Sequence, residues 1–139
     1  MSPSELQALR RMLFLEISEA APIIGKCSKR AWQYWESGRS IPPEKVYKSL
    51  EMSLKFRNNL FNKAKKEVLK SSNKTNLRWY RLFEEFRVEY HDQNELAWRI
   101  YQSILVGLKA EIPEGVELSR EGRVLDSIDY VMKTVKSKR

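Results

Sequence analysis

Apolar residues recur at intervals of three and four along the first part of the chain, which is the spacing of amphipathic helices. This pattern predicts a first helix over residues 3–13, with Ser2 as its N-cap and Pro3 at the first helical position. A second, short helix is expected over residues 16–24, and Pro22 should either kink it or lie in its first turn. The front of the chain is therefore expected to begin with two short helices.

A third and a fourth helix are expected before the middle of the chain. Ser28 can cap a helix that ends near Ser37, because Gly38 suits the left-handed conformation of a C-cap. After an extended stretch at residues 40–43, apolar residues at helical spacing predict one long helix over residues 43–69. Lysines decorate this fourth helix, so its exposed side is expected to be basic.

The rear of the chain is also expected to be mostly helical, with one ambiguous segment. Residues 71–76 are rich in Ser and Asn and are expected to form a linker. Residues 77–80 could form either a short strand or the start of a helix. Helices are then expected over residues 83–90, from a cap at Asp92 or Asn94 to Lys109, and over residues 119–136. The whole pattern predicts a mainly α fold with at most one short strand.

Charge is distributed unevenly along the chain, whose net charge is +8. Residues 1–70 carry 14 Lys and Arg against 7 Asp and Glu, whereas residues 71–139 carry 12 against 11. A basic front half favours a polyanionic partner, and the near-neutral rear half suggests a different role. The alternative is a charge that only keeps the protein in solution.

Several kinds of site are disfavoured by composition. One Cys and one His exclude a disulfide within the chain and leave no Cys/His metal site, and no cofactor is expected. His91, Asp92 and Glu95 could form an acid–base cluster, but no nucleophile or glycine-rich phosphate loop accompanies them, so no enzyme is expected. We find no signal peptide and no membrane-length apolar run, and therefore expect a cytoplasmic protein without membrane contact.

The segment after Ser28 is the most informative, because a helix there would have two distinct faces. At about 100° per residue, one face gathers polar side chains: Arg30, Gln33, Tyr34 and Ser37. The other face carries side chains that can pack against the two preceding helices: Ala31, Trp32 and Trp35. This division is typical of a recognition helix that enters the major groove of DNA.

Individual residues of this segment suit particular contacts with DNA. Arg30 can donate two hydrogen bonds to a guanine edge, and Gln33 can bond an adenine edge in the same bidentate way. Ser28 and Lys29 are placed for phosphate at the helix N-terminus, and Arg39 is a further phosphate candidate. The candidate DNA-binding residues are Ser28, Lys29, Arg30, Gln33, Tyr34, Ser37 and Arg39.

The same segment carries a resemblance to known repressors. A helix-turn-helix pattern followed by Trp-Glu-Ser-Gly resembles the Cro/C1-type repressors. The match is closer to the anti-CRISPR-associated repressors of the second family and to the related YdiL-like proteins. The resemblance covers about residues 1–110 and rests on residues 5–8, 18–21, 32–40, 77–80 and 98–103.

The resemblance implies a homodimeric transcriptional repressor that binds an inverted repeat in double-stranded DNA. It implies repression of the protein's own operon, often beside an anti-CRISPR gene in phage, and its own mRNA as a further partner. Residues 1–70 would then be a helix-turn-helix DNA-binding domain, and residues 77–139 a helical dimerisation domain. It also suggests a buried salt bridge between Arg10 and Glu36, for which a solvated pair is the alternative. The tail from about Glu111 departs from the shorter members of the family.

Dimerisation is also expected from the rear half itself, which has more apolar helix faces than a small subdomain can bury alone. The residues expected at or behind the interface are Trp98, Ile100, Tyr101 and Ile104. A purely intrachain core is the alternative for these four residues.

Two other functions compete with a DNA-binding repressor. One is an antitoxin-like protein whose rear half binds a partner while the helix-turn-helix only autoregulates. The other is an RNA-binding translational regulator, suggested by the lysine-rich fourth helix and by the aromatic and basic run at residues 78–81.

Overall fold

The computed structural model describes residues 1–136 and divides the chain into two compact units. Unit 1 is Met1–Phe56, and unit 2 begins at Arg57. The border lies inside one long helix, α4 (Glu44–Lys70), whose first part belongs to unit 1 and whose second part belongs to unit 2. The fold is mainly helical, as the sequence pattern predicts, but it contains a small two-stranded sheet where at most one short strand was expected.

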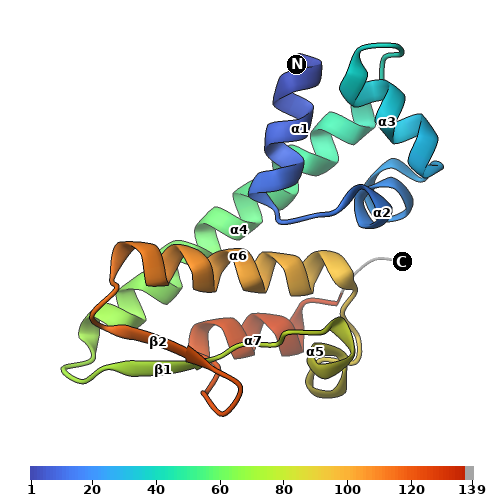
Figure 1. Cartoon of the computed structure of the whole chain (residues 1–139). Helices are drawn as coiled ribbons and strands as arrows, with labels where there is room; N and C mark the ends of the chain where they lie inside the picture. Colours follow the sequence, from blue (N-terminus) through green and yellow to red (C-terminus); the bar gives the residue numbers. More distant parts are fainter. Residues whose placement is uncertain (137–139) are drawn as a thin grey trace. The chain divides into compact units, whose positions relative to one another are not determined.

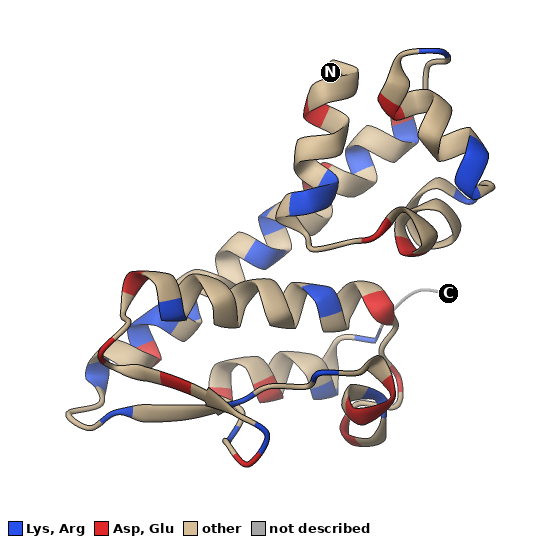
Figure 2. Ribbon diagram, in the orientation of Figure 1, with Lys and Arg blue, Asp and Glu red and all other residues tan. Residues whose placement is uncertain are grey.

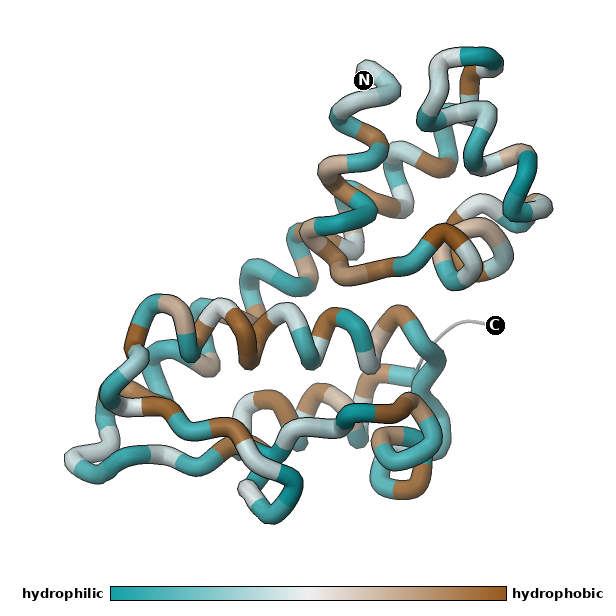
Figure 3. Tube along the Cα trace, in the orientation of Figure 1, coloured by the Kyte–Doolittle hydropathy of each residue, from teal (hydrophilic) through white to brown (hydrophobic). Residues whose placement is uncertain are grey.

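Unit 1 is entirely helical (Figure 1). Before α4 it contains α1 (Pro3–Met12), α2 (Ile17–Ala20), the π-helix η1 (Ala21–Gly25) and α3 (Lys29–Ser37). Hydrophobic residues are interleaved with hydrophilic ones along these helices (Figure 3), which is the pattern that lets each helix bury one side. Leu6, Leu13, Trp32, Val46 and Leu50 are fully buried and form the core of unit 1.

The start of α1 is fixed by a capping box. The Ser2 hydroxyl accepts a hydrogen bond from the backbone N–H of Glu5 at 3.1 Å, and the Glu5 carboxylate accepts one from the N–H of Ser2 at 3.2 Å. Two of the backbone donors at this helix end are thereby satisfied, so the predicted cap is confirmed.

Pro22 interrupts the second helix as its sequence predicts. Because proline has no N–H, it cannot continue the α-helical ladder, and the chain widens into the π-helix η1 over Ala21–Gly25. Lys26 ends this helix in the left-handed conformation, and its N–H donates to the carbonyl of Ala21. The interruption brings the chain round into the turn that precedes α3.

Unit 2 combines helices with a parallel pair of strands. After α4 it contains β1 (Thr75–Arg78), α5 (Phe83–Glu89), α6 (Glu95–Glu111), β2 (Val116–Ser119) and α7 (Asp126–Thr134). The strands pair in register from Thr75 opposite Val116 to Arg78 opposite Ser119, and Figure 1 shows them side by side. Parallel pairing requires a crossover, which α5 and α6 supply.

Two sequence expectations in unit 2 are wrong in their boundaries. The final helix begins at Asp126 instead of at residue 119, because residues 116–119 form β2. The expected linker at residues 71–76 ends early, because β1 already begins at Thr75. For residues 77–80, the strand alternative holds for Leu77 and Arg78.

No helix within residues 1–136 is both long enough and apolar enough to cross a bilayer.

Candidate nucleic-acid interface

The structure confirms that α3 has two faces of opposite character. Trp32 and Trp35 are buried, and their rings lie 5.5 Å apart between centroids. On the other side, Arg30, Gln33 and Ser37 are exposed, whereas Tyr34 is only partly exposed. One helix therefore packs with its tryptophans and presents polar groups to the outside.

The beginning of α3 combines a cap with exposed positive charge. The Ser28 hydroxyl accepts a hydrogen bond from the N–H of Ala31 at 3.1 Å, so the predicted N-cap is confirmed. Its hydroxyl proton is still available as a donor. Lys29 is exposed beside it, and the helix dipole adds positive potential at this end. The pair is suited to an anion such as a phosphate group.

Gly25 in η1 packs very closely against its neighbours, including Trp32 of α3. A Cβ atom at Gly25 would lie 2.8 Å from the Sγ atom of Cys27 and 3.0 Å from a ring carbon of Trp32. Only glycine fits here without a shift of its neighbours. The bare backbone of Gly25 thus lets the tryptophan face of α3 pack closely against η1.

The end of α3 is closed by Gly38, which has a φ of +83°. The chain turns back there, so that the N–H groups of Arg39 and Ser40 donate to the carbonyl of Tyr34 at 2.9 and 3.3 Å. The guanidinium of Arg39 lies over the Tyr34 ring, with its central carbon 4.5 Å from the ring centroid. Figure 2 shows the resulting distribution, with basic residues at both ends of α3.

A buried ion pair ties α3 to α1. The Arg10 Nε and Nη2 atoms donate to the two oxygens of Glu36 at 2.6 and 3.1 Å, and the side chains are only 9% and 7% exposed. The indole N–H of Trp32 donates to the same carboxylate at 2.5 Å. The suggested Arg10–Glu36 salt bridge is therefore confirmed as a buried pair. Trp32 was missed as its partner, although its spacing of four from Glu36 was a usable signal.

Glu36 stays ionised in this network. Burial is the largest single influence and opposes ionisation, but hydrogen bonds from Arg10 and Trp32 and the charge of Arg10 outweigh it. Together they hold the pKa of Glu36 below its ordinary value. The carboxylate thus fixes the angle between α1 and the back of α3.

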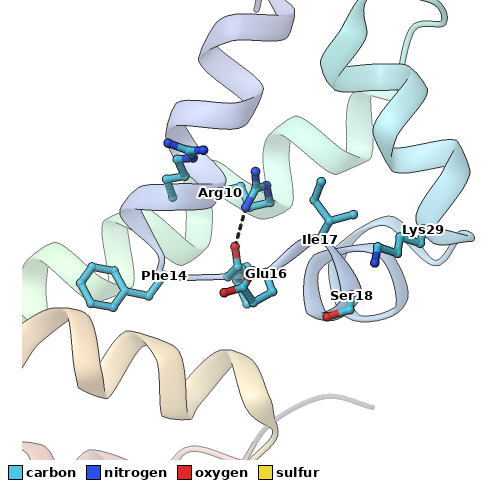
Figure 4. A pocket seen from close by; sticks show the side chains of 8 residues that line it. Arg10, Phe14, Glu16, Ile17, Ser18 and Lys29 are labelled. Carbon is cyan, nitrogen blue, oxygen red and sulfur yellow. Dashed lines mark hydrogen bonds between the residues drawn. The ribbon is translucent and has the colours of Figure 1, made fainter.

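An open hollow of about 560 Å³ lies next to the start of α3 (Figure 4). Its lining is Arg10, Arg11, Phe14, Leu15, Glu16, Ile17, Ser18 and Lys29. Arg10 is already engaged, since its Nη1 atom donates to the carbonyl of Leu15 at 2.8 Å. Across the described part of the chain, no group of three acidic, His or Cys side chains could hold a metal ion.

The four residues expected at a dimer interface lie inside unit 2. Trp98, Ile100, Tyr101 and Ile104 of α6 are all buried. The Trp98 indole N–H donates to the carbonyl of Tyr80 at 2.8 Å, and the Tyr101 hydroxyl donates to that of Arg78 at 2.6 Å. In this chain they belong to the interior of unit 2. They could therefore contribute to an interface only by holding in place the surface residues that form it.

The tail is joined to unit 2 by polar contacts that sequence reasoning missed. The Glu67 carboxylate of α4 accepts hydrogen bonds from the N–H groups of Asp126 and Ser127, both at 3.0 Å, and so caps α7. Tyr90 donates to Asp129 at 2.6 Å, which fixes the next turn of the same helix. No local spacing in the sequence signals these pairs, because the partners lie far apart along the chain.

Comparisons with known proteins match most of this architecture. The Aca2/YdiL-like family model matches residues 1–116. The chain is 38% identical over 104 residues to the Aca2 repressor of Pectobacterium phage ZF40, covering 75% of this chain and 89% of that protein. It is 28% identical over 111 residues to the uncharacterized protein YdiL of Escherichia coli (strain K12), covering 79% of this chain and 94% of YdiL.

The matched region contains all of unit 1 and continues through α6 into the first residue of β2, so it includes α3 and the Arg10–Glu36 pair. The rest of β2 and α7 lie outside it. On the extent of this match, the chain belongs to the Aca2/YdiL-like family.

Proposed function

We propose that this protein is a sequence-specific DNA-binding transcriptional repressor. Unit 1 acts as a helix-turn-helix domain of the Cro/C1 type, in which α2 and η1 support α3 as the recognition helix. In this role Arg30 and Gln33 contact base edges, and Ser28 and Lys29 contact phosphates.

The observation that carries the proposal is the exposed polar face of α3 on a helix whose other face is anchored. Trp32, Trp35 and the Arg10–Glu36 pair hold α3 from behind, so its outer side chains are presented from a rigid base. The phage relative is named a repressor, which supports a role in transcriptional regulation. This name describes regulation instead of catalysis.

We further propose that the protein acts as a homodimer on an inverted repeat in its own promoter, where it autorepresses an anti-CRISPR operon in the cytoplasm. One helix-turn-helix unit reads too few base pairs for tight binding, and a two-fold dimer doubles the site. The rear of the chain, residues 77–139, would supply the dimer contacts, while residues 1–70 bind the DNA.

The test compares two variants that each lose one positive charge. Arg30→Ala removes one bidentate contact, so the binding free energy for the operator should weaken by about 1–3 kcal/mol while the fold is retained. Lys74→Ala is the matched control, because Lys74 is exposed and lies outside both residues 1–70 and residues 77–139. Gel-shift titration measures both, and circular dichroism checks the fold. Normal operator affinity of folded Arg30→Ala protein would refute the assignment of α3.

A further inference from the structure

The side chain of Arg39 is exposed at the protein surface, yet it contacts an aromatic ring of the same chain. Its guanidinium stacks on the Tyr34 ring at 4.5 Å, and its own N–H is bonded to the Tyr34 carbonyl at 2.9 Å. Ser40 donates to the same carbonyl, and the Ser37 hydroxyl does so at 3.0 Å. At the end of α3, the Tyr34 carbonyl therefore accepts the hydrogen bonds that close the turn, and the Tyr34 ring contacts Arg39.

The turn at Gly38 determines where this arginine lies. A helical wheel gives no position to Arg39, because the residue follows the helix end. The left-handed conformation of Gly38 folds the chain back, and the stack then places the Arg39 guanidinium beside Tyr34. Arg39 thereby lies over Tyr34, which helical spacing places on the same face of α3 as Arg30, Gln33 and Ser37.

The guanidinium is stacked but is not neutralised. Within residues 1–136, no acidic side chain forms an ion pair with Arg39. Its N–H donors are thus available to a partner, from a position over the Tyr34 ring.

The two kinds of DNA contact open to Arg39 differ in the information that they carry. An arginine can bind a phosphate through two donors of its planar fork, but this contact is the same at every base pair. A guanine edge presents O6 and N7 side by side, so two donors must lie in the plane of the base. A side chain that already rests on an aromatic ring has less conformational entropy to lose when it makes such a contact.

We propose that Arg39 reads a guanine edge of the operator and that Tyr34 is the positioning residue that fixes the Arg39 plane. The inference rests on the proposed DNA-binding function. It replaces the phosphate contact that the sequence suggested for Arg39, and it adds one base position per half-site to those read by Arg30 and Gln33.

The experiment is selection from a random duplex DNA pool by the full chain and three variants. Arg39→Ala removes the guanidinium and Tyr34→Leu removes the ring, so both should lose preference for the same guanine in each half-site. Each should bind the wild-type operator about tenfold more weakly, as expected for one bidentate contact. Tyr34→Phe, which keeps the ring, should restore the preference.

A modified operator tests the contact without relying on the Tyr34 variants. Substitution of 7-deazaguanine at that position removes the N7 acceptor, so it should weaken wild-type binding about tenfold and leave Arg39→Ala binding unchanged. Inosine at the same position keeps O6 and N7 and should have no effect.

Two results would overturn the inference. If Arg39→Ala still selects the wild-type sequence and only flattens the salt dependence, Arg39 contacts phosphate and the inference is overturned. The same holds if Tyr34→Leu folds and keeps the guanine preference. Failure of the proposed function would look different, because the wild-type chain itself would then select no duplex.

Discussion

Units 1 and 2 use buried polar side chains in different ways. In unit 1 a buried ion pair, Arg10–Glu36, joins two helices and also accepts the indole N–H of Trp32. In unit 2 neutral side chains of α6 donate to backbone carbonyls, as Trp98 and Gln102 do to Tyr80. The ion pair of unit 1 fixes the angle between α1 and α3. The hydrogen bonds of unit 2 instead hold the irregular segment at Tyr80, which has no hydrogen bonds of a helix to stabilise it.

This difference has a physical consequence for stability. Removing one partner of a buried ion pair leaves an uncompensated charge, which is more costly than a lost neutral hydrogen bond. Unit 1 should therefore be sensitive to loss of charge, and unit 2 to changes in backbone packing. The following predictions test that contrast.

The largest effect is expected from Arg10→Ala, because Glu36 would stay buried without its charged partner. Unit 1 should lose about 3–5 kcal/mol of unfolding free energy. Urea unfolding combined with hydrogen exchange of unit 1 amides measures the loss. The control is Lys48→Ala, which breaks the exposed pair with Glu44 and should cost under about 0.5 kcal/mol. If both substitutions lowered the unfolding free energy equally, the buried pair would be no more important for stability than the exposed one, and the prediction would be wrong.

A smaller effect, confined to unit 2, is expected from Gly122→Ala. A Cβ atom at Gly122 would lie 2.3 Å from the carbonyl carbon of Leu77 and 2.6 Å from the amide nitrogen of Arg78. Because both are backbone atoms of β1, the strand must shift, at a cost of about 3 kcal/mol. Amide exchange should speed up in β1 and β2 and stay unchanged in α3. Wild-type protection of both strands would show that the loop does not rest on β1 in solution.

Acid should destabilise both units, with the smallest effect of the three. The folded pKa of Glu36 lies below its ordinary value of 4.5. Glu67 is shifted in the same direction: burial opposes the shift, and hydrogen bonds from Ser127 and Asp126 outweigh it. A lowered folded pKa gives stability that is complete above pH 4.5 and is lost as the pH falls through the folded value.

Urea unfolding between pH 3 and pH 7 measures this acid dependence. Glu36→Gln should flatten it for unit 1, and Glu67→Gln should flatten it for unit 2. If neither substitution changes the acid dependence, these carboxylates are not the groups that titrate on unfolding.

Local patterns explain what the sequence could predict. The cap at Ser28, the two faces of α3 and the break at Pro22 each depend on residues within one or two helical turns. The Arg10–Glu36 pair was suggested by a family resemblance, and its burial is confirmed by the structure.

The rest depends on contacts between distant segments. β2 has no clear alternation and exists because β1 offers it a parallel partner far earlier in the chain. The start of α7 is set by Glu67, which lies on another helix. The Tyr34–Arg39 stack depends on the turn at Gly38, and a helical wheel cannot represent a residue beyond the helix end.

The central claim, that the outer face of α3 reads DNA, is tested most directly by selecting ligands for the full chain from random duplex DNA and random RNA pools. The account predicts a duplex palindrome whose half-site centres lie roughly 10 base pairs apart, or a multiple of that spacing. It predicts that the Arg30→Ala protein loses this palindrome. An asymmetric duplex site, or RNA hairpins bound far more tightly than any duplex, would contradict it.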